Sequence, residues 1–124
     1  MTQSLDWRGY YDREGETKTF HPEVDPAERM RVDSLGSRMT LNLDSANALD
    51  AGCRNGFLAS RCLEWGATRV AGIDFSRPRL ADGSARYPAI RFSRASATSL
   101  PFADKSFELV SLVEVLEHLP EPRL

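Results

Sequence analysis

The sequence predicts an α/β fold built on a doubly wound parallel sheet. Three observations lead to this prediction: short apolar segments alternate with segments of helical periodicity, a glycine-bearing turn follows the first of these apolar segments, and two successive apolar segments end in an aspartate. Strands separated by helices of this length favour right-handed βαβ units. The length of 124 residues lies within the range of one domain, so a single core is expected.

The N-terminal part is expected to contribute one helix. Residues 1–24 mix aromatic and charged side chains without a sustained period, so this segment is expected to be irregular. Asp25 is an N-cap candidate, and Pro26 suits the first helical position. A helix is therefore predicted from about residue 26 to residue 39, and its apolar positions are Met30, Leu35 and Met39.

The remaining elements alternate between strand and helix. Residues 46–50 are expected to form a short buried strand, because alanines and a leucine lead directly into Asp50. Apolar residues then follow helical spacing from Phe57 until Gly66, which suits a helix C-terminus. The later elements are a strand at 70–74, a helix at 77–86, a short strand at 90–93 and a strand at 107–113. The last strand is apolar enough for burial on both faces.

Composition and charge exclude several classes of protein. Hydrophobic residues make up 41% and charged residues 27% of the chain, which is ordinary for a globular domain. The formal net charge of -2 gives no reason to expect binding to nucleic acid. No apolar run has the roughly 18 residues that a membrane span needs, and no secretory signal is visible, so a cytoplasmic location is expected. Cys53 and Cys62 are too far apart for a CxxC pair, and metal binding is not expected.

The segment from Asp50 to Gly56 is the first candidate for a binding site. Gly52 and Gly56 lack a Cβ, so the backbone can turn sharply and a ligand can lie against it. The helix that begins there offers unpaired N–H groups to polar atoms of a ligand. A tight strand-to-helix connection without a ligand explains the same residues, and this alternative stays open.

Asp74 is the second candidate. It ends the strand predicted at 70–74 and follows Gly56 by 18 positions. About twenty residues is the spacing that places an acid at the tip of the neighbouring strand, where it accepts hydrogen bonds from ribose hydroxyls. The alternative is a structural role as the N-cap of the following helix, a role that Ser76 can also fill.

Two later segments carry a resemblance to a known family. They read ASATSLPFADKSFELV at residues 95–110 and VEVLEHL at residues 113–119. Together with the glycine turn and Asp74, they closely resemble class I S-adenosylmethionine-dependent methyltransferases, in particular the group that includes ubiquinone and menaquinone C-methyltransferases and many small-molecule methyltransferases. The resemblance covers about residues 46–119. It implies a Rossmann-like sheet with strand order 3-2-1-4, and residues 25–124 are then a partial domain, truncated after the fourth strand.

The resemblance also implies which residues bind S-adenosylmethionine. The turn would surround the methionine part, with Asp50 reaching its ammonium group directly or through water. Asp74 would hold the ribose hydroxyls and Phe75 would pack on one face of the adenine. The other residues that it implies for the cofactor site are Ala51, Gly52, Cys53 and Gly56 in the turn, Ser96 and Ala97 at the adenine edge, and the backbone of Val113 and Glu114 near the ammonium group.

The chain departs from the family pattern at two of these places. Arg54 stands where the family most often has the middle glycine, so its side chain is expected either to point to solvent or to fill part of the pocket. Ser96 stands where the family usually has an acid. Hydrogen bonds to a neutral partner are weaker than those to a charged one, which predicts weaker binding of the adenine amino group.

The predicted function is therefore methyl transfer from S-adenosylmethionine to an unknown, small-molecule acceptor. No catalytic residue is assigned, because Glu117 and His118 are as well explained by the start of a helix as by a general base. Two alternatives are kept: a non-catalytic remnant that binds the cofactor or a nucleotide, and a nicotinamide-dependent dehydrogenase fragment, which the absence of GxGxxG disfavours. The outer edge of the strand at 107–113 is expected to pair with another chain, which includes self-association, or with a missing continuation of the sequence; otherwise poor solubility is expected.

Overall fold

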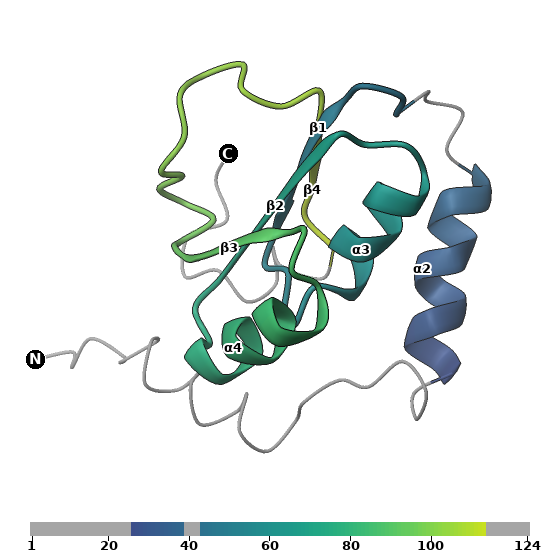
Figure 1. The fold of residues 1–124 in the computed structure, drawn as a ribbon, viewed down its shortest axis with the longest axis horizontal. Coiled ribbons are helices and arrows are strands. Elements are labelled where there is room, and N and C mark those ends of the chain that lie inside the picture. Colours follow the sequence, from purple (N-terminus) through teal and green to yellow (C-terminus); the bar gives the residue numbers. More distant parts are fainter. Residues whose placement is uncertain (1–25, 39–42, 114–124) are drawn as a thin grey trace, which may run out of the picture.

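The computed structural model describes residues 26–38 and 43–113, and these form a parallel sheet with helices packed against it (Figure 1). The strand order is β3-β2-β1-β4 and every pairing is parallel, as the sequence predicted. The elements, in chain order, are α2 (Pro26–Arg38), β1 (Asn47–Ala51), α3 (Phe57–Glu64), β2 (Arg69–Asp74), α4 (Arg77–Arg86), β3 (Arg91–Arg94) and β4 (Leu109–Ser111). Residues 1–25, 39–42 and 114–124 lie outside the described part, and so does the whole of the N-terminal segment predicted as irregular, residues 1–24.

The two central strands separate two apolar layers. On one face of the sheet, Ala48 of β1 and Val70 of β2 pack with residues of α3. On the other face, Leu49 and Ile73 are almost fully buried, and the partly buried hydrophobic residues that cover them come from the segment at 95–112. Successive side chains of a strand point to opposite faces, so the central strands are buried on both sides.

Glycine ends helix α3, as predicted. Gly66 has a φ of 109°, in the left-handed region that glycine adopts most easily. Its N–H donates to the carbonyl of Leu63 at 3.1 Å, and the N–H of Ala67 donates to the carbonyl of Cys62 at 3.0 Å. These bonds satisfy carbonyls in the last turn of the helix and direct the chain into β2.

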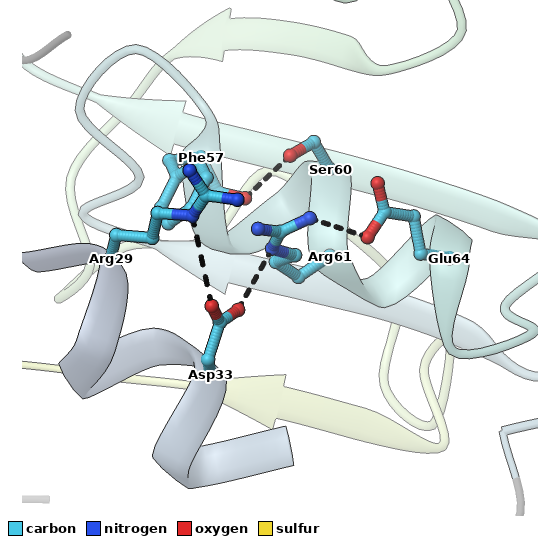
Figure 2. Close-up of polar contacts among 6 residues, drawn as sticks. All are labelled: Arg29, Asp33, Phe57, Ser60, Arg61 and Glu64. Carbon is cyan, nitrogen blue, oxygen red and sulfur yellow. Dashed lines mark hydrogen bonds and ion pairs between the residues drawn. The ribbon is translucent and has the colours of Figure 1, made fainter. Parts of the chain in front are cut away.

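Helix α2 lies against α3 and is held there by charge and packing (Figure 2). Asp33 of α2 pairs with Nε of Arg61 at 3.1 Å, and the Arg61 guanidinium also lies over the Phe57 ring, 4.8 Å from its centre. Val32 is buried beside Phe57. The apolar set predicted for this helix is wrong at Met30, which is 72% exposed, because the helix turns Val32, rather than Met30, toward α3.

Strand β4 is shorter and more exposed than the sequence predicted. Only Leu109–Ser111 form the strand, rather than 107–113, and Val110 is 47% exposed. The prediction of burial on both faces is wrong because β4 is an outer strand of the described sheet and pairs with β1 on one side only. Phe107 instead precedes the strand, and its ring packs edge-to-face against Phe102, with ring centres 5.0 Å apart.

Candidate functional site

Two buried aspartates lie at the same edge of the sheet. Asp50 near the end of β1 is 3% exposed and Asp74 at the end of β2 is 8% exposed. The strands are parallel and Asp50 lies opposite Gly72 in their register, so the two acids come at neighbouring strand tips. The chain order reverses between β1 and β4, and ligands of open α/β sheets bind at such a switch point, beyond the carboxyl ends of the strands.

The loop between β1 and α3 folds back onto the end of β2. Gly52, Arg54 and Gly56 have φ values of 80°, 54° and 96°, all in the left-handed region. The N–H groups of Gly52 and Cys53 both donate to the carbonyl of Ile73 at 2.8 Å. These two N–H groups are therefore hydrogen-bonded within the protein. They fix the shape of the loop and are not available to a ligand.

Close packing explains two of the glycines near this loop. A Cβ on Gly56 would lie 2.5 Å from the Phe92 ring of β3, and one on Gly72 would lie 2.8 Å from the sulfur of Cys53. Both distances are too short for real atoms, so substitution would require the Phe92 ring or the Cys53 side chain to shift, and at Gly56 it would also strain the left-handed backbone. Gly56 and Cys53, both predicted to surround a ligand, are therefore also packing residues of the β2–β3 side.

Asp74 is held by two backbone groups. One carboxylate oxygen accepts from the N–H of Arg54 at 2.8 Å, and the other accepts from the N–H of Ser76 at 2.9 Å. Ser76, not Asp74, is the N-cap of α4, since its hydroxyl oxygen accepts from the N–H of Arg79 at 3.3 Å. The alternative of Asp74 as the helix cap is thus wrong. Each carboxylate oxygen has a second lone pair, so Asp74 keeps acceptor capacity for a ligand.

Asp50 is held by a side chain of the outer strand. The Ser111 hydroxyl donates to its Oδ1 at 2.8 Å. Burial raises the pKa of the Asp50 carboxyl to about 7; the Ser111 hydrogen bond opposes this rise, the charge of Asp74 adds to it and the charge of Arg54 opposes it. A cation placed beside Asp50 would favour its charged form. Ser111 was not singled out from the sequence, and the β1–β4 register is the signal that would have identified it, because it sets Ser111 opposite Asp50.

The other predicted residues fall around the end of β2. Phe75 follows Asp74, and its carbonyl accepts from Nε of Arg94 at 2.8 Å. The chain then returns past this point, since the N–H of Ala95 donates to the carbonyl of Asp74 at 3.2 Å. Ala97 packs against the layer that contains Ile73.

Three further predicted site residues are Ser96, Val113 and Glu114. The hydroxyl of Ser96 lies 2.6 Å from that of Thr98 and accepts from the Thr98 N–H at 3.1 Å, so it is engaged locally. Val113 follows β4 and is half-buried. Glu114, and with it Glu117 and His118, lies outside the described residues.

Comparison with known proteins shows the family. Residues 49–124, more than half of the chain, match the family model described as a methyltransferase domain. The chain belongs to the family of class I S-adenosylmethionine-dependent methyltransferases. The nicotinamide-dependent dehydrogenase fragment considered above is therefore the wrong family.

Relatives in this methyltransferase family are longer than the chain. It is 34% identical to the ubiquinone biosynthesis O-methyltransferase of Pseudomonas fluorescens, in an alignment that covers 91% of this chain and 48% of the relative. The protein of the same name from Neisseria meningitidis is 31% identical, and the alignment covers the same two shares. The chain thus spans about half the length of the curated relatives it matches.

Solved structures share the fold of this chain. The [4+2]-cyclase SpnF is 26% identical, with a TM-score of 0.69 over 78% of this chain and 38% of SpnF. An S-adenosylmethionine-dependent methyltransferase from Mesorhizobium loti is also 26% identical, with a TM-score of 0.57 over 73% of this chain and 40% of that protein. One fold serves proteins named for different reactions, so the reaction must be argued from the site.

No helix among residues 26–38 and 43–113 has the length and apolar character to cross a membrane.

Proposed function

We propose that this chain binds S-adenosylmethionine at the carboxyl ends of β1 and β2, as the cofactor-binding part of a methyltransferase for a small-molecule acceptor. The observation that carries this proposal is the pair of buried carboxylates, Asp50 and Asp74, at adjacent strand tips. The ligand has a cationic ammonium group and a ribose with two neighbouring hydroxyls. Two carboxylates in a protein interior suit these partners, because a buried charge needs an opposite charge or hydrogen bonds.

In this proposal, Asp50 and Asp74 each bind a different part of the cofactor. Asp74 accepts from the ribose hydroxyls, since its two backbone bonds leave lone pairs and fix its orientation. Asp50 faces the ammonium group, which compensates the cost of keeping a buried carboxylate charged. Phe75 covers one face of the adenine, Ser96 and Ala97 meet its edge, and the backbone of Val113 and Glu114 lies near the ammonium group.

The chain's contribution to the reaction is binding and orientation. When bound, S-adenosylmethionine supplies a methyl group on a sulfonium that is already reactive. The protein holds this methyl group toward the acceptor and keeps the cofactor's two polar ends fixed. The relatives' name, ubiquinone biosynthesis O-methyltransferase, suggests a hydroxyl of a small molecule as the acceptor. A cytoplasmic location and pairing through the outer edge of β4 remain predictions.

Calorimetric titration with S-adenosylhomocysteine tests the proposal. The purified chain should bind one equivalent, and Asp74→Asn should weaken binding about 10-fold or more, since a charged acceptor for the ribose becomes a neutral one. Asp104→Asn is the matched control, because Asp104 is an exposed acid in the loop before β4 and should leave the affinity unchanged. Absence of binding at millimolar ligand, or equal losses in both variants, would overturn the proposal.

A non-catalytic binding module is the second candidate. The local engagement of the Ser96 hydroxyl with Thr98 favours it, because that hydroxyl is less free to meet the adenine edge. Incubation of the chain with methyl-labelled S-adenosylmethionine and a panel of small phenols separates the two. Labelled product supports the enzyme, whereas S-adenosylhomocysteine binding without any labelled product supports the module.

A further inference from the structure

Ser111 connects the outer strand to the acid of the central strand. It is the last residue of β4 and lies opposite Asp50 in the parallel register. Its hydroxyl donates to Asp50 Oδ1 at 2.8 Å and lies 3.4 Å from the Leu49 carbonyl. A hydroxyl has one hydrogen to give, and the shorter distance and the negative charge both favour the carboxylate as its acceptor.

This hydroxyl is the carboxylate's one hydrogen-bond donor within residues 26–38 and 43–113. Asp74, by contrast, receives two backbone N–H groups. The orientation of Asp50 among the described residues therefore depends on a single side chain from a different strand. Since Asp50 lies almost wholly out of water, water offers little replacement for that bond.

The charges around Asp50 oppose one another. From β2, the carboxylate of Asp74 raises the pKa of Asp50, and from the loop the guanidinium of Arg54 lowers it. The thiols of Cys53 in the loop and Cys62 in α3 are also near enough for the charge of Asp50 to raise their own pKa values.

β4 contributes Ser111 to this surrounding. Its hydrogen bond lowers the pKa of Asp50, and it is the largest of the influences that do so. With that pKa at about 7, small changes around Asp50 alter how much of it is charged near neutral pH.

We propose that Ser111 is a positioning residue, which orients the Asp50 carboxylate toward the ammonium group of S-adenosylmethionine and holds it in the charged form. This inference rests on the proposed function, because it concerns the same site. Ser111 acts through Asp50, to which its hydroxyl donates. The outer strand thereby sets the affinity of the central site for a ligand that carries an ammonium group.

A pH profile distinguishes this role from a merely structural one. Affinity for S-adenosylhomocysteine should rise between about pH 6 and pH 8 as Asp50 loses its proton. In Ser111→Ala the lost hydrogen bond should move the rise to higher pH and weaken binding at pH 7 about 3- to 10-fold. Ser111→Thr keeps the hydroxyl and should restore the wild-type profile.

5′-Methylthioadenosine is the matched ligand for the experiment. It has the adenine and ribose of S-adenosylhomocysteine but lacks the ammonium and carboxylate groups. Titrations of both ligands into the wild-type chain, Ser111→Ala and Ser111→Thr from pH 5.5 to 8.5 should show changes for S-adenosylhomocysteine alone. Unchanged methylthioadenosine binding also shows that Ser111→Ala folds around an intact nucleoside site.

The remaining outcomes separate the two proposals. If both ligands bind but Ser111→Ala leaves the S-adenosylhomocysteine profile unmoved, or weakens both ligands equally, the role of Ser111 is overturned and the proposed function stands. If Ser111→Ala does not fold, the profile of Ser111→Cys, whose thiol is a weaker donor, takes its place under the same criteria. If the wild-type chain binds neither ligand, the proposed function fails and the role of Ser111 fails with it.

Discussion

The tips of β1 and β2 carry the same residue type at the same edge of the sheet, yet they support it differently. Asp74 receives two backbone N–H groups, from Arg54 and Ser76, so it is part of the framework that shapes the loop and the start of α4. Asp50 receives one side-chain hydroxyl, from Ser111, and is more deeply buried. Backbone hydrogen bonds thus stabilise the Asp74 carboxylate. The buried charge of Asp50 instead costs free energy, which a cationic ligand would offset.

The burial of Asp50 determines how the free energy of unfolding changes with pH. The folded pKa of Asp50 is about 7, above the unfolded value of 3.8. Between these values the folded protein binds more protons than the unfolded chain, so Asp50 makes the free energy of unfolding fall as pH rises from about 4 to 7. A bound ammonium group would lower the folded pKa and reduce that loss.

The largest expected effect comes from removing the framework acid. Asp74→Ala leaves the N–H groups of Arg54 and Ser76 without their acceptor, and each buried unsatisfied donor costs roughly 1–3 kcal/mol. We expect the free energy of unfolding to fall by about 2–5 kcal/mol, measured by urea denaturation at pH 7.

Asp74→Asn sharpens this prediction. It retains one acceptor oxygen, so it should lose about half as much stability as Asp74→Ala. If Asp74→Ala lost less than about 0.5 kcal/mol, the two backbone hydrogen bonds of Asp74 would not stabilise the fold. The proposed difference between Asp74 and Asp50 would then be contradicted.

The second prediction is that replacing Asp50 raises the free energy of unfolding. Asp50→Asn removes a carboxylate whose burial opposes ionisation, while the amide oxygen can still accept from Ser111. We expect a gain in the free energy of unfolding on the order of 2–4 kcal/mol at pH 8 and almost none at pH 4, where Asp50 is protonated in the folded protein. S-adenosylhomocysteine affinity should fall at the same time.

Thermal unfolding of Asp50→Asn and the wild-type chain from pH 4 to pH 8 measures this prediction. The two melting temperatures should diverge as pH rises. Parallel melting curves across the range would mean that Asp50 is not a cost to the fold, and the contrast with Asp74 would then lose its energetic basis.

The sequence predicted the parts of the fold that local chemistry decides. Helix α4 spans residues 77–86, as expected, and Ser76 caps its start. Gly66 ends α3, since its left-handed φ costs glycine little. The strand order 3-2-1-4 came with the family resemblance and is confirmed.

The parts that were missed depend on partners far away in the chain. The exposure of Val110 follows from the position of β4 at the outside of the described sheet, which its own apolar sequence does not reveal. The bond from Ser111 to Asp50 joins residues 61 positions apart, so only strand register discloses it. Gly52, Gly56 and Asp74 were candidates from their residue types and spacing, whereas the other site residues came from the resemblance. The contacts of all of them with a ligand stay predictions.

Arg54 interacts with both acids and offers the test with the smallest expected effect. Its N–H bonds to Asp74, whereas its guanidinium lowers the pKa of Asp50. It also has a φ of 54°, which glycine adopts more easily than arginine. We expect Arg54→Gly to raise the free energy of unfolding at pH 5 by about 0.5–1 kcal/mol, because relief of the left-handed backbone exceeds the added flexibility of the unfolded chain.

Arg54→Ala separates the backbone from the charge. It removes the guanidinium but keeps the Cβ, so at pH 5 its stability should stay within about 0.5 kcal/mol of wild type. Both variants should move the pH dependence of S-adenosylhomocysteine binding upward, because Asp50 loses a nearby positive charge while Asp74 keeps the backbone N–H of residue 54. Equal stability of Arg54→Gly and Arg54→Ala would contradict the expected relief of the left-handed backbone. An unchanged pH dependence of S-adenosylhomocysteine binding would mean that the guanidinium does not act on Asp50. If both expectations hold, one residue supports the two acids by separate means, through its backbone for Asp74 and through its charge for Asp50.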